Sequence, residues 1–194
     1  MNEIIALSGN PNSGKTTLFN ELTGARQHVG NYPGVTVEKK KGTYSHNGNR
    51  FKIVDLPGTY SLTAYSLEEV VARDFLVNEK PGMVINIVDA SNLQRNLYLS
   101  LQFMEMGIPL CIALNMVDVA KTRGIDINIV KLSELLGIPV IPTIARRGVG
   151  KQELMEAVAD NIKIKKPPNF AISYGNDIDD ALDEIKKKIE LNDF

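Results

Sequence analysis

Cysteine, tryptophan and histidine are nearly missing from this chain of 194 residues. It has one cysteine, Cys111, no tryptophan, and two histidines, His28 and His46. A single cysteine excludes a disulfide within the chain and suits a reducing cytosol. Cys111 lies in the apolar stretch 108–114, so we expect a buried thiol rather than a nucleophile. The two histidines are isolated and lack the spacing of metal ligands, and we expect ordinary polar residues.

Long apolar runs and an excess of one charge are also missing. The chain has 22 basic and 23 acidic residues, so no overall field favours nucleic acid or an anionic membrane. No run approaches the roughly 20 apolar residues of a membrane-spanning helix. The first residues run directly into a strand pattern, so no signal peptide is expected. The length suits one domain with an appendage, and we expect a soluble chain.

Short apolar runs alternate with helical patterns along most of the sequence. This alternation predicts an α/β fold with a mostly parallel, six-stranded sheet and helices on both faces. An Asn-Gly pair at 47–48 predicts a hairpin between 37–45 and 51–55, which places one antiparallel strand at the edge of the sheet. The other predicted strands are 4–7, 83–88, 109–114 and 140–142, and the predicted helices are 67–77, 93–106, 129–136 and 151–162.

The pattern changes near residue 163, which divides the chain into a first domain, 1–163, and an appendage, 164–194. Residues 163–168 read as a charged linker that ends in two prolines, and 177–191 as an amphipathic helix. Its apolar face needs a partner. Either the helix packs back on the first domain, or it begins a helical domain that is truncated here; we favour the second. The face consists of Ile178, Ala181, Leu182, Ile185 and Ile189.

The most informative motif is GNPNSGKT at residues 9–16, between a predicted strand and a predicted helix. Its two glycines let backbone N–H groups turn towards phosphate oxygens, and the helix N-terminus adds its positive dipole end. Lys15 is expected to reach the β- and γ-phosphates, and the Thr16 hydroxyl to bind Mg²⁺. The predicted phosphate-binding residues are Gly9, Asn10, Pro11, Asn12, Ser13, Gly14, Lys15, Thr16 and Thr17.

Two further loops complete the predicted phosphate and magnesium site. Asp55-Leu56-Pro57-Gly58 follows a strand, where the Asp55 carboxylate is expected to hold the water shell of Mg²⁺. The Gly58 backbone N–H is expected to approach the γ-phosphate and to move when that phosphate leaves. In the Gly- and Pro-containing loop 29–36, Gly34 and Val35 precede Thr36, whose hydroxyl is the third predicted magnesium ligand.

Residues 115–118 predict that the base is guanine. Asn115-Met116-Val117-Asp118 fits N-[KT]-x-D except at Met116, where Lys is usual. The Asp118 carboxylate accepts two hydrogen bonds from the N1–H and N2–H₂ edge of guanine, which adenine cannot supply. Ile144-Ala145-Arg146 stands where a Ser-Ala-Lys loop supports the base, and the Ala145 N–H is expected to reach guanine O6. Met116 and Ile144 leave the strength of guanine binding open. These elements, in this order, predict a Ras-like P-loop GTPase.

Hydrolysis needs groups that position water and neutralise charge. Lys15, Thr36 and Gly58 are candidates, but Thr59 stands where Ras-type enzymes have a glutamine, so intrinsic hydrolysis is expected to be slow. The pattern G-x-P-N-x-G-K resembles that of GTPases activated by monovalent cations. That resemblance implies that the Asn12 amide oxygen helps seat K⁺ beside the β- and γ-phosphates. The alternative is that Asn12 merely suits a tight turn.

Residues 9–150 resemble the cytosolic G domain of the ferrous iron transport protein B family (FeoB). The resemblance depends on 9–16, 30–38, 55–62 and 96–99, and it includes positions without a direct nucleotide role. It implies a GTP-dependent switch that controls Fe²⁺ uptake through a membrane permease absent from this chain. The location implied is the cytoplasmic side of the cell membrane. A homo-oligomer through the switch loops stays open, and no nucleic acid is expected.

Two other functions stay open from the sequence. Era-like GTPases that act on RNA or ribosomes also carry an asparagine in the phosphate loop. They usually have a basic RNA-binding module, whereas this chain is nearly neutral and its tail has no GXXG loop. A nucleotide-binding module without hydrolysis would need disabled motifs, but Lys15, Thr16 and Asp55 are intact.

Overall fold

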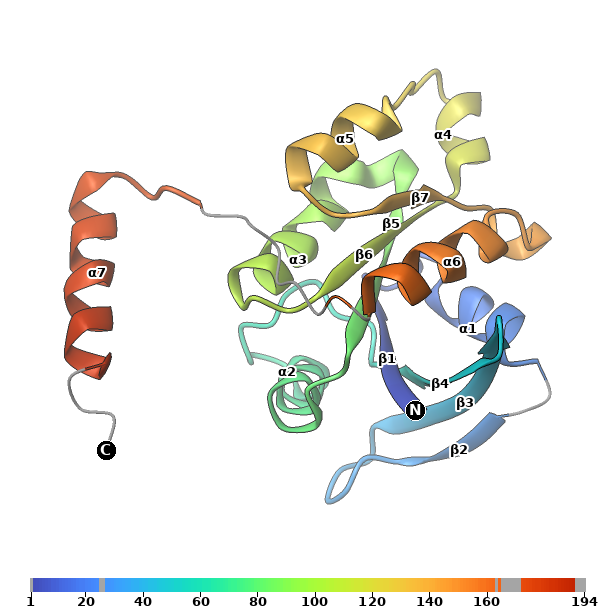
Figure 1. Ribbon diagram of the computed structural model, residues 1–194, viewed down its shortest axis with the longest axis horizontal. Coiled ribbons are helices and arrows are strands. Elements are labelled where there is room, and N and C mark those ends of the chain that lie inside the picture. Colours follow the sequence, from blue (N-terminus) through green and yellow to red (C-terminus); the bar gives the residue numbers. More distant parts are fainter. Residues whose placement is uncertain (1, 25–26, 163, 165–171, 191–194) are drawn as a thin grey trace.

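The computed structural model describes residues 2–24, 27–162, 164 and 172–190. Their central element is a seven-stranded sheet with helices on both faces (Figure 1). The strands are β1 Asn2–Gly9, β2 Gln27–Asn31, β3 Glu38–His46, β4 Asn49–Asp55, β5 Met83–Asp89, β6 Leu110–Asn115 and β7 Val140–Pro142. The helices are α1 Lys15–Thr23, α2 Leu67–Glu79, α3 Leu93–Glu105, α4 Val117–Thr122, α5 Ile129–Leu136, α6 Lys151–Ile162 and α7 Asn176–Glu190, with 3-10 turns η1 Ala90–Asn92 and η2 Ala145–Arg147.

The strand order is β2-β3-β4-β1-β5-β6-β7. Five neighbouring strands, from β4 to β7, are parallel, and β3 runs antiparallel to both of its neighbours. The predicted fold class is therefore confirmed, but the count of six strands was wrong. Gln27–Asn31 forms a seventh strand, so β2 rather than β3 is the edge. Its side chains are mostly exposed, and with no buried face the strand left no alternating apolar pattern in the sequence.

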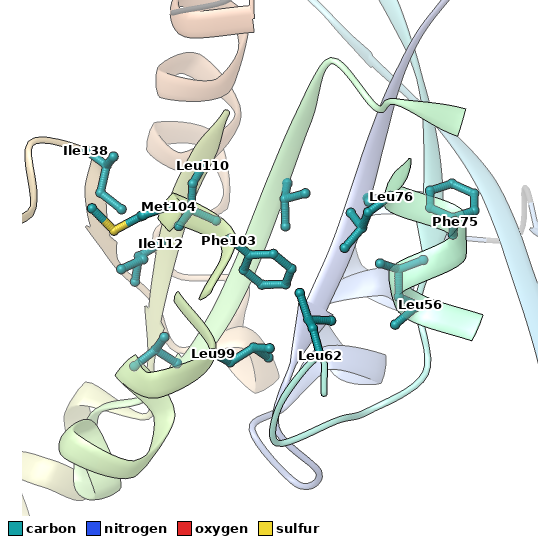
Figure 2. Packing of buried hydrophobic residues seen from close by; sticks show 14 of the residues in the cluster. Leu56, Leu62, Phe75, Leu76, Leu99, Phe103, Met104, Leu110, Ile112 and Ile138 are labelled. Atoms are coloured by element: carbon teal, nitrogen blue, oxygen red, sulfur yellow. The ribbon is translucent and has the colours of Figure 1, made fainter. Parts of the chain in front are cut away.

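Each central strand divides its side chains between two cores, because successive residues point to opposite faces of a sheet. On β5, Met83, Ile85 and Ile87 face α1 and α6, whereas Val84 and Val88 face the side of α2 and α3. Figure 2 shows the second core, where Leu62 lies beside Phe103 of α3 and Leu56 beside Leu76 of α2. These two buried leucines anchor the start and the middle of the loop between β4 and α2, residues 56–66.

The parallel arrangement gathers the predicted motifs at one edge of the sheet. β1 ends at Gly9, β4 at Asp55 and β6 at Asn115. The register pairs Leu7 with Asp55 and Gly9 with Ile87, so these strands end at nearly the same level. Ligands of such sheets bind beyond the carboxyl ends of the strands, particularly where the strand order reverses.

The C-terminal helix α7 stands apart from the rest of the chain (Figure 1). Its apolar side chains, including Ile178 and Ile185, remain about half exposed, at 52% and 54%. The predicted helix is confirmed to within one residue at each end that the structure describes, but it does not pack back on the sheet. Most of the predicted linker, 163–168, lies outside the described residues.

Candidate functional site

The loop between β1 and α1 is built around a backbone that needs two left-handed residues. Asn12 has φ 66° and Gly14 has φ 94°. A Cβ on Gly14 would lie 2.2 Å from Nδ2 of Asn115, so only glycine fits. The Ser13 N–H closes the turn on the Asn10 carbonyl at 3.1 Å. Asn12, Thr16 and Thr17 are exposed at the mouth of this loop, where a phosphate chain would meet them.

A cation and a carboxylate meet below this loop. Lys15 Nζ lies 2.6 Å from Asp55 Oδ1, and their side chains are only 12% and 7% exposed. Burial raises the pKa of Asp55 above its ordinary value, although the charge of Lys15 opposes that shift. Asp55 therefore keeps a positive partner in a place where an unpaired carboxylate is costly.

The segment after Asp55 packs directly under the phosphate loop. A Cβ on Gly58 would meet Pro11 Cα at 3.5 Å, and the Thr59 N–H lies 3.3 Å from the Gly9 carbonyl oxygen. Thr59 is 3% exposed, so its side chain points into the protein. Asn10 is equally buried, and among the described residues its amide atoms have no hydrogen-bond partner. Gly58 thus lies close to the loop that is expected to hold phosphates.

Glu69, in the first turn of α2, holds the loop between β4 and α2 through hydrogen bonds, a role that the sequence analysis missed. Its carboxylate accepts hydrogen bonds from the Ser61 hydroxyl at 2.8 Å and from the Tyr65 N–H at 3.0 Å. With Ser66 it also forms a capping box at the start of α2. The Ser61 bond holds the pKa of Glu69 below its ordinary value. The S-x-x-E pattern at 66–69 was the signal that could have identified it.

The same loop is fastened to α3 at two points. The Leu62 N–H donates to Gln102 Oε1 at 2.9 Å. The Arg95 guanidinium lies 4.3 Å from the centre of the Tyr60 ring, a cation–π contact. The loop that contains Gly58 is therefore held to α3 by two contacts.

Thr36 lies on an exposed turn between β2 and β3, where Val35 N donates to Tyr32 O at 3.3 Å. Among the described residues, Thr36 forms no hydrogen bond with Thr16 or Asp55, the other two predicted magnesium ligands. Tyr32 anchors the start of the turn: it is 6% exposed and packs edge-on against Phe75. Gly34 and Val35 lie between this anchor and Thr36.

The predicted base site lies between the phosphate loop, the start of α4 and η2. A cavity of about 110 Å³ is lined by Gly14, Thr17, Asn115, Met116, Asp118, Val119, Ile144, Ala145 and Arg146. Met116 has φ 59°, and its Cε would lie 3.7 Å from a Cβ on Gly14. Met116 therefore forms an apolar wall beside the phosphate loop.

Asp118 faces this cavity with one oxygen paired and one oxygen free. Oδ2 accepts from Arg146 Nη2 at 2.5 Å. Oδ1 is buried, and among the described residues it accepts no hydrogen bond. The hydrogen bond from Arg146 holds the pKa of Asp118 below its ordinary value, so the carboxylate is ionised at neutral pH.

The Asn115 side chain links the phosphate loop to η2. Its Nδ2 donates to Ser13 O at 2.9 Å, and its Oδ1 accepts from the Ala145 N–H at 2.9 Å. The Ala145 N–H was predicted to reach guanine O6, but in this structure Asn115 uses it. Thr143, fully buried, also donates to Asn115 at 3.4 Å. These hydrogen bonds join residues far apart in sequence, so no local sequence pattern predicted them.

Cys111 lies inside the protein, as the sequence predicted. Its side chain is fully buried, and burial raises the pKa of the thiol to about 12. Across the described residues, no group of three or more His, Cys, Asp or Glu side chains could hold a metal ion. None of the helices described is both long and apolar enough to span a bilayer.

Comparisons with known proteins agree with this geometry. The sequence model described as ferrous iron transport protein B matches residues 3–158. Over 158 residues the chain is 54% identical to the Fe(2+) transporter FeoB of Escherichia coli (strain K12). This match covers 79% of the chain and 20% of the E. coli protein. The chain spans about a fifth of the length of the curated relatives it matches, 20–22%.

Two solved structures have the same fold. The cytosolic domain of L. pneumophila FeoB has a TM-score of 0.92 and 39% identity, covering 98% of this chain and 82% of that one. A mutant of S. thermophilus NFeoB bound to GDP has a TM-score of 0.87 and 46% identity, covering 96% and 72%. With its phosphate loop, its Asp55 and Asp118 loops and these matches together, the chain belongs to the ferrous iron transport protein B family and contains its G domain.

Proposed function

We propose that this chain binds and hydrolyses GTP and acts as the regulatory domain of a ferrous iron transporter. The observation that carries the proposal is the common edge where the phosphate loop, Asp55 and Asp118 meet. The GDP-bound relative supports guanine as the base. Membership of the family disfavours the alternative of an Era-like GTPase that acts on RNA.

Guanine would enter the cavity beside Asp118. Its N1–H and N2–H₂ donors match a carboxylate, whereas adenine would leave the Asp118 oxygens desolvated and unpaired, at a cost of about 1–3 kcal/mol or more. Met116 would pack against the base where Lys is usual. The phosphates would extend over residues 9–17, with Lys15 at the β- and γ-phosphates.

Mg²⁺ fits the donor set at this edge. The hydroxyls of Thr16 and Thr36 and the Asp55 carboxylate, acting through water, are hard oxygen donors of the kind that Mg²⁺ prefers. The Asp55 site already holds a cation, since the Lys15 ammonium lies there. When bound, Mg²⁺ would neutralise charge on the β- and γ-phosphates. Thr36 lies on an exposed turn, and we propose that the loop around Gly34–Thr36 changes shape with the nucleotide.

Hydrolysis by these residues alone would be slow. Thr59 is buried and cannot orient a water molecule as the glutamine of Ras-type enzymes does. Among the described residues, no arginine forms a hydrogen bond or an ion pair with the phosphate-loop residues 9–17. We propose that K⁺ compensates, held in part by the amide oxygen of Asn12. The left-handed backbone of Asn12 also satisfies the turn, so the two roles are compatible.

The nucleotide state would be passed on through the loop after Asp55. Gly58 lies under the phosphate loop, and the contacts of Tyr60 and Leu62 fasten the same loop to α3. We propose that residues 1–163 are the G domain and that 164–194 begin a helical domain, whose further helices would cover the exposed face of α7. A membrane permease in the full-length protein would keep this chain at the cytoplasmic side of the membrane.

Two measurements test the proposal. The purified chain with Mg²⁺ should release phosphate from GTP and not from ATP. If GTP yields no phosphate, the proposal that the chain hydrolyses GTP is wrong. The transport role is tested in the E. coli transporter after its matching segment is replaced by residues 3–158 of this chain. Cells with this chimera should take up radioactive Fe²⁺, and cells with its Lys15→Met variant should not. Equal Fe²⁺ uptake by the chimera and its Lys15→Met variant would reject the proposal that this chain regulates transport.

A further inference from the structure

Arg146 occupies the carboxylate that the guanine base is proposed to use. Its Nη2 lies 2.5 Å from Asp118 Oδ2, and both residues line the same cavity of about 110 Å³. Asp118 sits in the first turn of α4 and Arg146 in η2, so two separate elements bring the pair together. The arginine therefore lies at the site itself and not on a remote surface.

The Arg146 guanidinium and the guanine base present the same kind of hydrogen-bond donor to Asp118. A guanidinium presents N–H groups in a planar fork, and a carboxylate accepts such a fork with both oxygens. The N1–H and N2–H₂ edge of guanine is also a planar pair of N–H donors on a C–N framework. Arg146 and guanine thus compete for the same oxygens, and neither can pair fully with Asp118 while the other is present.

The two partners differ in how easily they can move. The Arg146 side chain is 69% exposed, and Asp118 is its hydrogen-bond partner in the described chain, whereas the Asp118 side chain is 23% exposed. Oδ1 of Asp118 is buried and accepts no hydrogen bond from Arg146, so the arginine holds the carboxylate through Oδ2 alone. The long arginine can swing into solvent, while the carboxylate stays in place.

We infer that Arg146 is an internal competitor of guanine, a displaceable side chain that holds Asp118 in the nucleotide-free protein and lowers guanine affinity. This inference rests on the proposed role of Asp118. Displacing an exposed ion pair lowers affinity by a modest factor, so we expect removal of the Arg146 charge to tighten GDP binding about two- to fivefold. The factor should shrink as salt screens the pair.

The test compares Arg146→Met with Arg147→Met. Methionine keeps a long apolar stem against the base and removes the charge, and Arg147 is an exposed neighbour in the same turn, with no side-chain partner in the described chain. Calorimetry with GDP at low and high salt should show tighter binding for Arg146→Met, converging on the parent at high salt. Arg147→Met should bind like the parent at both.

An NMR titration of the Asp118 carboxyl in the nucleotide-free protein gives a second readout. The pKa should rise towards its ordinary value in Arg146→Met and stay low in Arg147→Met. An unchanged pKa would overturn the inference, because the pair would not exist in solution. A risen pKa with equal or weaker GDP binding would overturn it too, because Arg146 would then not compete.

Failure of the underlying function is seen separately. If Asp118→Asn leaves GDP affinity intact, Asp118 does not bind guanine, and the inference falls with the proposed function. If Asp118→Asn abolishes GDP binding while Arg146→Met fails to tighten it, only the competition is wrong.

Discussion

Lys15 Nζ and Asp55 Oδ1 lie 2.6 Å apart across forty residues of sequence. One residue is expected to bind phosphate and the other to hold the water shell of Mg²⁺. In the free site each satisfies the other, so Asp55 is already neutralised before any ligand arrives. We therefore expect Mg²⁺ alone to bind weakly, because only a phosphate chain would draw Lys15 away.

Lys15→Met should make stability depend on pH. Burial raises the pKa of Asp55 above its ordinary value of 3.8, and loss of the Lys15 charge should raise it further. A raised folded-state pKa contributes stability below the unfolded value that is lost as pH rises through the folded value. The variant should lose about 1–3 kcal/mol relative to the parent at neutral pH and less in acid.

Urea unfolding at about pH 4 and about pH 7 measures this difference. Lys131→Met is the control, because its pair with Glu134 has side chains 63% and 61% exposed. The control should change little at either pH. A loss of stability in Lys15→Met that is equal at both pH values would contradict the role given to Asp55.

Glu69→Ala should loosen the loop after β4. The substitution removes the acceptor of Ser61 and Tyr65 and half of the capping box. Each lost hydrogen bond to the charged group is worth about 1.5 kcal/mol or more, so amide exchange across residues 61–66 should accelerate at least about tenfold. Glu68→Ala, one residue earlier in the same helical turn, should leave exchange unchanged. Equal exchange in both variants would show that Glu69 does not order the loop.

Gly150→Ala should disturb the base site more than its backbone angle alone predicts. Gly150 has φ 79°, and its Cβ would lie 2.1 Å from Pro142 O. Gly124 has a similar φ of 73° with nothing within 4 Å, so Gly124→Ala isolates the backbone strain, about 1–2 kcal/mol. Gly150→Ala should cost clearly more by thermal unfolding and should weaken GDP binding. If both variants behave alike, the close approach to β7 is unimportant.

Potassium should accelerate GTP turnover. A fixed cation beside the β- and γ-phosphates supplies charge where it develops, and one such electrostatic contact is worth about 10²-fold in rate. Turnover in KCl should exceed turnover in NaCl, and Asn12→Ala should abolish the difference. Equal rates in the two salts, or an Asn12→Ala protein as fast as the parent, would reject the role of Asn12.

The sequence predicted those parts of the fold that leave a periodic pattern. The strands buried on both faces read as apolar runs, and α3 was predicted to within one residue because its apolar residues recur along one face. β2 was missed because its contribution is backbone pairing to β3 with exposed side chains. α4 was missed because it has only six residues, too few for a helical period.

The candidate site divides in the same way. Lys15, Asp55 and Asp118 belong to short motifs whose spacing indicates their chemistry, and the structure brings each to the expected edge of the sheet. The ion pairs of Lys15 and Arg146 join separate motifs, so no single motif indicated them. Tyr32, before the exposed turn that holds Thr36, is buried against Phe75, a contact that the composition of the loop does not reveal.

The nucleotide preference of Asp118→Asn tests the account most directly. An asparagine presents a donor where guanine also has a donor, whereas xanthine has an acceptor there. In calorimetry the affinity of the variant for GDP should fall by about 10²-fold or more, and the variant should bind xanthosine diphosphate more tightly than the parent does. A variant that keeps its GDP affinity and still rejects xanthosine diphosphate would contradict guanine recognition by this carboxylate.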